Sequence, residues 1–343
     1  MSVKGYKAFN KGMICKGKQY KENTTYEENG NKICEAGVMH FCEEPFDVLN
    51  YYSLVDENGD ISDFADVEAV GDIYKRKDKT ATNKLHIGAK LGLKGFIKAC
   101  VDFTIEKTRV EPIKDNGTDN NNNNSAQIGS SGDSAKIGSS GYYAQIGSSG
   151  DYAKIGSSGD SAQIGSSGDS AKIGSSGDYA KIGSSGDSAQ IGSSGYSAKI
   201  GSSGDSAQIG SSGDSAKIGS SGYYAQIGSS GDSAQIGSSG DSAKIGSSGD
   251  SAKIGSSGDS AKITSEGKDS VIMAAGYNSI ARAKIGSWIT LAEWIRTDKT
   301  DDKGNYIWIP KCAKTECVDG ERIKEDTFYR LVDGEFKEVE SEE

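Results

Sequence analysis

The repeated stretch "DSAQIGSSGDSAKIGSSG", Asp205 to Gly222, decides the fold of the middle of this chain. From Ser125 to Gly267 the sequence repeats one nine-residue unit sixteen times, S-A-[K/Q]-I-G-S-S-G-[D/Y]. Ala and Ile stand two residues apart, so in a strand both point to one face while Lys or Gln points to the other. The unit therefore predicts a short β-strand followed by a corner at Gly-Ser-Ser-Gly, where glycine tolerates left-handed backbone conformations.

The number of units in each coil sets the architecture, because nine residues cannot enclose a core alone. Two units make an 18-residue coil with two facing strands, whereas three units make a triangular coil, and sixteen units divide into pairs but not into threes. We therefore expect a flattened β-solenoid of two parallel sheets. Eight coils stacked about 4.8 Å apart give a length of roughly 38 Å.

The third position of the unit offers a check on this pairing. An 18-residue coil places Gln127, Gln145 and Gln163 on one sheet and Lys136, Lys154 and Lys172 on the other. The order then reverses, with Lys181, Lys199 and Lys217 on the first sheet and Gln190, Gln208 and Gln226 on the second. A duplicated 18-residue unit with one additional nine-residue step would leave this pattern.

Composition changes along the chain predict a β-rich protein of several domains. The predicted parts are an α+β head (1–113), an Asn-rich linker (114–124), the solenoid with degenerate final repeats (125–285), an antiparallel β cap (286–337) and an acidic tail (338–343). In the head, strands are expected near Tyr6–Phe9 and Val38–Cys42, with a short helical piece after Pro45. The spacing of Leu93, Phe96, Ile97 and Cys100 is typical of one buried helix face.

The C-terminal cap is expected to be built from hairpins. Asp-Gly pairs separate its β-rich runs, and this dipeptide favours tight hairpin turns. The cap would cover the open end of the solenoid, whose unpaired strand edges otherwise invite association. We expect Trp288 and Trp294 to cover apolar surface there rather than to bind a ligand.

Charge and cysteine content exclude several classes of function. The net charge is −10, which argues against nucleic acid as a main partner, because such binding depends on Lys and Arg at phosphates. No apolar run resembles a signal peptide or a membrane span, so a cytoplasmic protein that does not bind membranes is expected. The six cysteines are then expected to be reduced thiols.

Several ligand chemistries suggested by the sequence are not favoured. The aspartates at the repeat corners resemble those of calcium-binding β-rolls, but Tyr142, Tyr196 and Tyr223 replace Asp outright, and a phenol is not an obligatory calcium ligand. The serine rows resemble ice-binding surfaces, yet the repeats lack Thr before Thr264. The spacing of Cys34, His40, Cys42 and Cys100 matches no common zinc pattern. We expect no metal and no cofactor, and calcium or ice binding remain lesser alternatives.

The ends of the chain resemble an uncharacterised family of bacteriophage and prophage proteins. The resemblance lies in "GYKAFNKGMICKGKQY", "CEAGVMHFCEEPFDVLNYY", "FADVEAVGDI" and "KLHIGAKLGLKGFI" near the N-terminus, and in "GSWITLAEW" and "VDGERIKEDTFYRLVDGEF" near the C-terminus. Members commonly carry short Gly/Ser/Ala-rich tandem repeats between such segments. The resemblance implies a phage origin and location in the host cytoplasm, but no activity.

A second resemblance links the head to ADP-ribosyltransferases. "GVMHFCEEPFDVLNYY" followed by "FADVEAVGDI" is similar to the strand and helix of those enzymes that contribute to NAD⁺ binding. The resemblance implies His40, Tyr51 and Glu68 as candidate catalytic residues. The first strand departs from the family, because "YKAF", Tyr6 to Phe9, stands where those enzymes have His-Gly or Arg-Gly.

The sequence favours a non-enzymatic binding or display scaffold built on the solenoid, with an ADP-ribosyltransferase-like or NAD-binding head as the alternative. The partner would be a host protein or a small molecule bound on the solenoid surface, and the sequence leaves open a monomer or a homo-oligomer. The variable outward residues are the candidates for such binding: Tyr142, Tyr143, Tyr152, Tyr179, Tyr196, Tyr223, Tyr224, Lys136, Lys154 and Lys172.

Overall fold

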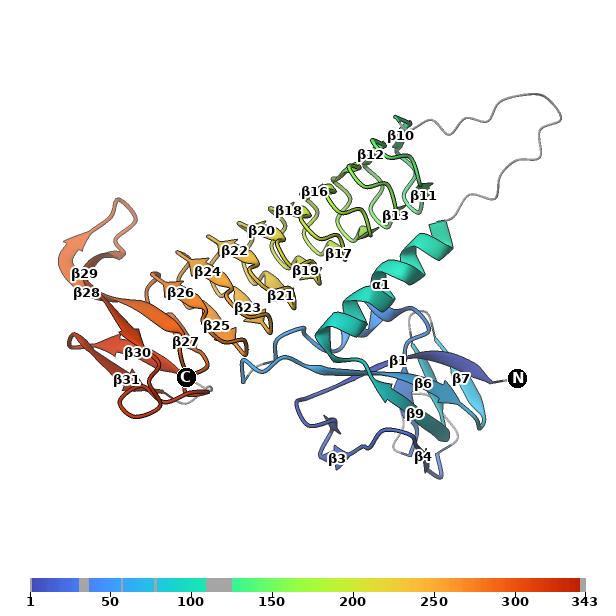
Figure 1. The fold of residues 1–343 in the computed structure, drawn as a ribbon, viewed down its shortest axis with the longest axis horizontal. Coiled ribbons are helices and arrows are strands. Elements are labelled where there is room, and N and C mark those ends of the chain that lie inside the picture. Colours follow the sequence, from blue (N-terminus) through green and yellow to red (C-terminus); the bar gives the residue numbers. More distant parts are fainter. Residues whose placement is uncertain (1, 31–36, 57, 77–78, 109–124, 340–343) are drawn as a thin grey trace.

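The protein is seen here in a computed structural model that describes residues 2–30, 37–56, 58–76, 79–108 and 125–339 (Figure 1). The linker predicted over 114–124 lies outside these residues, as does Cys34. The described chain forms a head, a β-solenoid of about nine coils and a set of C-terminal antiparallel strands. Within it, no helix is long and apolar enough to span a membrane.

The two-sheet solenoid predicted from the repeat is confirmed, with each strand paired in parallel to the strand 18 residues further on. Sheet one contains β10 (Gln127–Ser130), β12 (Gln145–Ser148), β14 (Gln163–Ser166), β16 (Lys181–Ser184), β18 (Lys199–Ser202), β20 (Lys217–Ser220), β22 (Gln235–Ser238), β24 (Lys253–Ser256) and β26 (Val271–Ala274). Sheet two contains β11 (Lys136–Ser139), β13 (Lys154–Ser157), β15 (Lys172–Ser175), β17 (Gln190–Ser193), β19 (Gln208–Ser211), β21 (Gln226–Ser229), β23 (Lys244–Ser247), β25 (Lys262–Ser265) and β27 (Ile280–Arg282).

The expected exchange of Lys and Gln between sheets is also confirmed. Gln163 pairs with Lys181 on sheet one, while Lys172 pairs with Gln190 on sheet two. Between the sheets, stacked Ile and Ala side chains form one continuous core, and the repeat Ile side chains from Ile137 to Ile263 are at most 5% exposed. Burial of these uniform side chains stabilises the stack, because apolar area removed from water contributes about 25 cal/mol per Å².

The glycines at the corners serve a different purpose from the one predicted. Among the described residues, no glycine from Gly129 to Gly276 has a positive φ. The corner glycines are required because coils approach closely: a Cβ atom on Gly204 would lie 1.9 Å from the carbonyl oxygen of Gly186. Any side chain there would therefore push successive coils apart.

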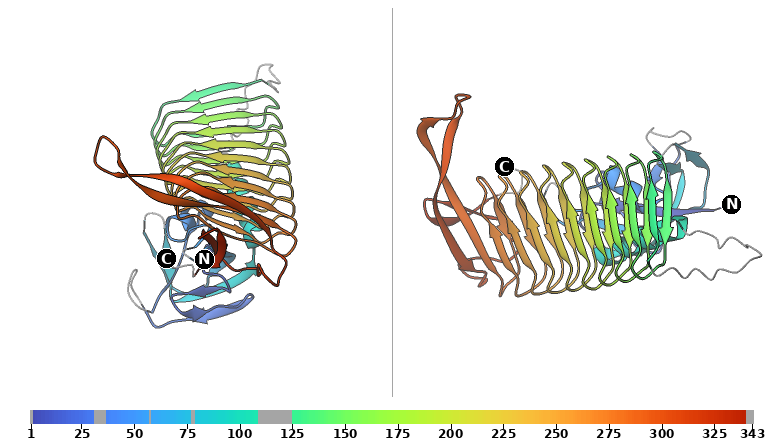
Figure 2. Two further views of the ribbon diagram at one scale, coloured as in Figure 1. Left: turned by 90° about the vertical axis from the view of Figure 1, so that its left-hand side faces the viewer. Right: turned by 90° about the horizontal axis from the view of Figure 1, so that it is seen from above.

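The antiparallel strands predicted after the repeats continue both sheets and close the C-terminal end of the solenoid. On sheet one, β28 (Trp288–Thr300) runs parallel to β26 and pairs antiparallel with β29 (Tyr306–Cys317). On sheet two, β27 is followed by β30 (Tyr329–Val332) and β31 (Glu335–Glu338). Tyr329 is buried against the last coils, and the β28–β29 hairpin projects beyond the stack (Figure 2).

The head combines three small sheets with two helical elements. Its four-stranded sheet has the order β1 (Val3–Phe9), β6 (Asp63–Ala69), β9 (Lys84–Lys90) and β4 (Thr24–Glu27). The smaller sheets are β2 (Ile14–Cys15) with β3 (Lys18–Gln19), and β5 (Met39–Phe41) with β8 (Thr80–Thr82) and β7 (Ile73–Lys75). The helical elements are the 3₁₀ helix η1 (Pro45–Asn50) and α1 (Gly92–Thr108). The helix predicted from Leu93, Phe96, Ile97 and Cys100 is confirmed, and all four side chains are buried.

The head lies along the solenoid rather than beyond its end. Figures 1 and 2 show α1 running beside the coils of sheet two, with the head sheets on the far side of the helix. Helix α1 therefore packs between two partners: Phe96 stacks on Phe64 of the head, and Ile97 contacts sheet two. This arrangement makes the two outer faces of the solenoid unequal.

Candidate functional site

Both sheets of the solenoid display the same outward pattern. In each repeat strand Ile and the following Ser point inward, so the Lys or Gln before Ile and the Gly after it point outward. Stacking in register produces two outer columns on each sheet, one of Lys or Gln and one of Gly. Because glycine has no side chain, each glycine column forms a shallow furrow beside a row of long polar side chains.

Helix α1 fills the glycine column of sheet two. A Cβ atom on Gly174 would lie 3.0 Å from the Cβ of Thr104, and one on Gly210 would lie 2.9 Å from Cγ1 of Ile97. The helix residues that meet successive glycines are Thr108 at Gly156, Thr104 at Gly174, Val101 at Gly192, Ile97 at Gly210 and Leu93 at Gly228. From one coil to the next, the helix residue in contact changes by about 3.75 positions on average, which corresponds to roughly 5.6 Å along the helix axis. The helical turn therefore nearly matches the strand spacing of about 4.8 Å, and each coil receives one turn.

Acidic groups of the head neutralise the lysines beside this column. The Glu44 carboxylate contacts Nζ of Lys154 at 2.5 Å and Nζ of Lys172 at 2.9 Å, and Asp47 lies 2.7 Å from Lys172. Burial opposes the charge on Glu44, but the two lysines lower its pKa overall. Burial likewise opposes the charge on Lys172, whose pKa the two carboxylates raise. For Asp47, burial outweighs Lys172 and raises the pKa.

Where sheet two carries Gln instead of Lys, the head offers amide, hydroxyl or backbone partners. Three glutamines donate from Nε2 to oxygen atoms of the head: Gln190 to Asn50 Oδ1 at 3.1 Å, Gln208 to the Leu49 carbonyl at 3.1 Å, and Gln226 to Ser53 Oγ at 3.2 Å. Lys154 and Lys172 thus face carboxylates, and the three glutamines on the next three strands face neutral acceptors. Over these five strands, the Lys/Gln pattern on sheet two is matched to the head.

The contact ends at the last coils of sheet two. Thr264 replaces a glycine of the column and donates to the Gly59 carbonyl at 2.5 Å. One coil further, Arg282 is 9% exposed and donates to the same carbonyl and to the Asp60 carboxylate at 2.7 Å. Lys11 also contacts Asp60 at 2.9 Å, and together the two cations lower the pKa of Asp60 although burial opposes this.

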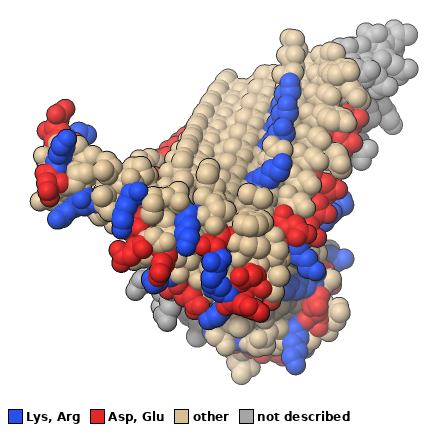
Figure 3. All heavy atoms as spheres, turned by 60° about the vertical axis from the view of Figure 1, so that its left-hand side comes forward, with Lys and Arg blue, Asp and Glu red and all other residues tan. Residues whose placement is uncertain are grey.

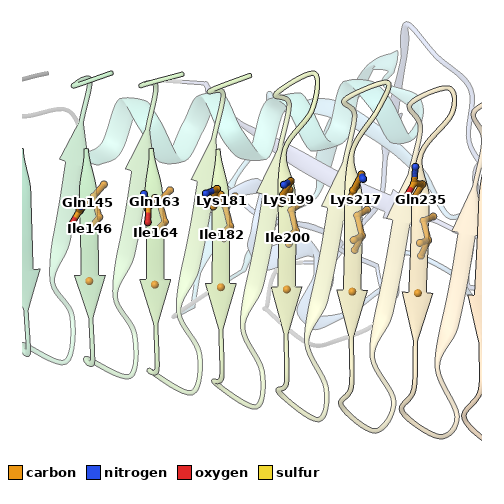
Figure 4. A pocket seen from close by; sticks show the side chains of 18 of the residues that line it. Gln145, Ile146, Gln163, Ile164, Lys181, Ile182, Lys199, Ile200, Lys217 and Gln235 are labelled. Atoms are coloured by element: carbon orange, nitrogen blue, oxygen red, sulfur yellow. The ribbon is translucent and has the colours of Figure 1, made fainter. Parts of the chain in front are cut away.

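The equivalent face of sheet one is open. No described atom lies within 4 Å of a Cβ atom built on its glycines Gly147, Gly165, Gly183, Gly201, Gly219 and Gly237. A groove of about 1450 Å³ follows this column from Gln127 to Met273. Figure 4 shows the polar side chains standing side by side, one per strand, along the open face, with α1 behind the strands. We call this surface the sheet-one face.

Three lysines form the centre of the charged column on the sheet-one face. Lys181, Lys199 and Lys217 stand on consecutive strands between Gln163 and Gln235. Within the described chain, none of these three lysines forms an ion pair. In the space-filling view, blue side chains form a row across an otherwise tan surface (Figure 3). This surface therefore combines an apolar furrow with an unneutralised positive row.

The furrow is closed at its C-terminal end. Met273 occupies the next position of the glycine column, and its Cε lies 3.8 Å from a Cβ atom built on Gly255. Val271 and Trp288 continue the lysine column as exposed apolar side chains. Trp294, in contrast, donates its indole N–H to the Ala275 carbonyl at 2.9 Å. The open furrow therefore ends at the cap.

The tyrosines and lysines named from the sequence are not gathered on one surface. All seven repeat tyrosines are exposed at corners, on both edges of the solenoid. One edge carries Tyr142, Tyr143, Tyr179 and Tyr196, and the other carries Tyr152, Tyr223 and Tyr224. Lys154 and Lys172 are engaged by the head, whereas Lys136 is exposed on the first strand of sheet two.

The corner aspartates act on the backbone in the C-terminal half of the solenoid. Asp232 accepts from the Asp250 N–H at 2.8 Å, and Asp241 does the same for Asp259. From Tyr224 onward, the first residue of each nine-residue unit, which follows the Asp/Tyr position, adopts a positive φ. Its N–H donates to a backbone carbonyl of the following coil. The carboxylates thus hydrogen-bond to the backbone of the next coil. Among the described residues, no cluster of three His, Cys, Asp or Glu side chains could hold a metal ion.

Two of the three catalytic candidates in the head share a pocket of about 840 Å³. His40 and Tyr51 both line it, together with Lys7, Cys15 and Tyr52. The Lys7 ammonium donates to the His40 carbonyl at 2.9 Å, and the Tyr52 hydroxyl donates to the Cys15 sulfur at 3.0 Å. Burial lowers the pKa of Lys7. Burial, aided by nearby lysines, lowers the pKa of His40 to about 4, so the imidazole is neutral at pH 7.

Glu68 lies apart from this pocket. It pairs with Lys4 and His86 across strands β1, β6 and β9, and lines a separate cavity with Asp66. The structure therefore brings together His40 and Tyr51 but not the three residues that the ADP-ribosyltransferase resemblance implies.

Sequence reasoning did not identify Lys7, Cys15 or the glycine furrow as candidate site features. The furrow had a visible signal, since Gly recurs two residues after every Lys or Gln and therefore points to the same side. For Lys7 and Cys15 the sequence carries no comparable signal, because three separate strands bring the pocket residues together.

Comparison with known proteins identifies one part of the chain. No curated protein and no solved structure matches the sequence. Residues 3–99 match a protein family described as a domain of unknown function (DUF7666). This range covers the head from β1 into α1, which confirms the prediction of an uncharacterised N-terminal domain. The similarity to this domain of unknown function is therefore limited to residues 3–99 of the head.

Proposed function

We propose that this protein is a non-enzymatic binding or display scaffold whose solenoid presents the sheet-one face to a partner. One observation carries the proposal: the chain already uses the same repeat surface for binding, because the head occupies it on sheet two. Solenoid coils contact mainly their neighbours and create extended surfaces suited to partner binding. A phage or prophage origin and a host cytoplasmic setting belong to this proposal.

The structure suggests a test that removes only the sheet-one face. The triple variant G183L/G201L/G219L fills the furrow at positions where a Cβ atom meets nothing within 4 Å, so folding should be retained. A matched control replaces three corner tyrosines, Tyr143, Tyr152 and Tyr179, by Leu. Both variants and the unchanged full chain are tagged and used for affinity capture from host cells.

The proposal expects the captured partners to disappear with the filled furrow and to persist with the tyrosine variant. An unchanged set of partners from a filled-furrow variant of normal melting temperature would refute binding on the sheet-one face. If the partners were lost only with the tyrosine variant, the binding surface would lie at the corners of the solenoid instead.

A second candidate function is small-molecule binding, including NAD⁺ binding, by the head. The observation in its favour is the pocket that joins His40, Tyr51 and Lys7. The test incubates the full chain with labelled NAD⁺ and host lysate, because the head packs its apolar face on sheet two and is not expected to be stable alone. Absence of both label transfer and nucleotide binding removes this candidate.

A further inference from the structure

We infer that the sheet-one face binds an amphipathic α-helix of a partner protein. The helix places small or β-branched apolar side chains in the glycine furrow, one per coil, and acidic side chains against Lys181, Lys199 and Lys217. This inference rests on the proposed function and specifies its partner.

The molecule itself provides the template for this binding mode. On sheet two the same furrow holds a helix, seated through Thr104, Val101 and Ile97 at successive glycines. The fit arises because the rise of one helical turn nearly equals the spacing between neighbouring strands. Both lengths are general properties of helices and sheets and do not depend on the sequence of α1. The furrow of sheet one has the same repeat, and its glycine column is empty.

The dimensions of the open furrow suit a helix somewhat longer than α1. Eight glycines, from Gly129 to Gly255, line the furrow before Met273 closes it. Seven steps of about 4.8 Å span roughly 34 Å, which corresponds to about 22 helical residues at 1.5 Å each. By comparison, the seat of α1 on sheet two covers the five glycines from Gly156 to Gly228.

Charge selects an acidic helix and disfavours a second copy of this chain. On sheet two, Lys154 and Lys172 are neutralised by Glu44 and Asp47 of the head. On sheet one, three consecutive lysines lack such acids. Two sheet-one faces packed together would bring two positive rows into one interface, and like charges close together disfavour association. A partner that supplies carboxylates completes the arrangement seen on sheet two.

The flank of the helix that should carry these carboxylates follows from α1. Cys100 lies on the side of α1 that packs against η1, and Asp47 of η1 pairs with Lys172. Phe96 and Phe103 lie four residues before and three residues after it, so all three positions fall on one flank. Acidic residues at these positions would face a lysine column, one turn per coil.

A synthetic peptide provides a direct probe. It contains residues 91–108 with the changes F96E, C100E and F103E, a hydrocarbon staple joining positions 94 and 98, and a fluorescent label. Positions 94 and 98 are exposed in α1, so the staple avoids the seat. Circular dichroism verifies that the peptide is helical. Binding to the full-length protein is followed by fluorescence anisotropy at near-physiological salt.

The inference expects saturable binding that weakens at least tenfold with G183L/G201L/G219L and at least tenfold with K181E/K199E/K217E. A control peptide with Gln at positions 96, 100 and 103 should bind at least tenfold more weakly and be insensitive to the lysine changes. Equal binding of the acidic peptide to all protein variants overturns the inference.

Two further outcomes would overturn the inference of a helical partner and would show whether the proposed scaffold function fails with it. If the helical peptide does not bind, but the filled furrow still abolishes capture of natural partners, the scaffold function stands and the helical occupant is wrong. If light scattering shows a dimer of the full chain that G183L/G201L/G219L converts to a monomer, the occupant is a second copy.

Discussion

Sheet one and sheet two are built from the same nine-residue unit, yet only sheet two is covered. The difference does not lie in the core, where Ile and Ala repeat identically on both sides. It lies in the outward Lys and Gln residues and in what meets them. On sheet two, from Lys154 to Gln226, they match the carboxylates and neutral acceptors of the head, whereas on sheet one three lysines stand together without an acidic partner. A uniform core thus supports two faces of different chemistry.

The largest expected difference comes from filling the glycine columns. Gly192→Leu on sheet two should clash with Phe46 and Val101, whereas Gly201→Leu on sheet one meets no atom within 4 Å. Overpacking a fitted interface costs about 1–3 kcal/mol or more, so G192L should lower the free energy of unfolding by about that amount and loosen the head. G201L should change it by less than about 0.5 kcal/mol.

Chemical denaturation of the two glycine variants measures this difference, and limited proteolysis of the head reports its release. Equal destabilisation by both substitutions would show that the head is not seated in the furrow of sheet two.

The next difference concerns the lysines. Lys172→Met leaves Glu44 and Asp47 without their shared cation, apart from Lys154 on Glu44. Breaking a fully buried pair costs about 3–5 kcal/mol, and partial exposure here reduces the expected loss to about 2 kcal/mol. Lys199→Met on sheet one is the matched control and should fall within about 0.5 kcal/mol. Similar losses in thermal denaturation for the two variants would contradict the inequality of the faces.

Acid should loosen the covered face selectively. The folded protein lowers the pKa of Glu44 below its ordinary value of 4.5, so its stabilising contribution is complete above pH 4.5 and is lost as the pH falls through the lower, folded value. Asp47 has a raised pKa and opposes this trend. Limited proteolysis between pH 6 and pH 3 should show that the head is released from sheet two near pH 3. The E44Q variant should weaken this dependence of head release on pH.

The smallest effect tests the matching of Gln to neutral acceptors. Gln208→Lys places an ammonium against the Leu49 carbonyl in a partly buried contact and should cost about 1 kcal/mol. Gln163→Lys at an exposed position of sheet one should cost almost nothing. Differential scanning calorimetry of the pair measures the difference, and a neutral Q208K would mean that the Lys/Gln pattern on sheet two carries no structural information.

The solenoid could be predicted from the sequence because its rules are local. The two-residue spacing of Ala and Ile, the pairing of nine-residue units and the alternation of Lys and Gln predicted both sheets and their register. The reason given for the corner glycines was wrong, because contact between Gly204 and Gly186 occurs between coils and is not visible in one unit. A local sequence pattern predicts a strand well, but it does not predict how closely the neighbouring coils approach one another.

The inequality of the two faces could not be predicted, because the repeats themselves look alike. Lys172 and Lys199 belong to identical nine-residue units, S-A-K-I-G-S-S-G-D, but only Lys172 lies beside Glu44, which is more than a hundred residues away in sequence. His40 and Tyr51 were predicted together and do share a pocket, but Lys7 reaches that pocket from another strand. Such long-range placement depends on how the head packs.

The head also limits how the gene for this protein can change. Nearly identical repeats in DNA readily gain or lose copies during replication and recombination. Ion pairs with the head run from Lys154 to Arg282, so a coil inserted between them would shift one end of the head's binding site by about 4.8 Å relative to the other. Copies added before Lys154 would leave all of these contacts intact. Tolerated length variants should therefore differ at the N-terminal coils. Packing of the head thus restricts where repeats can be gained or lost.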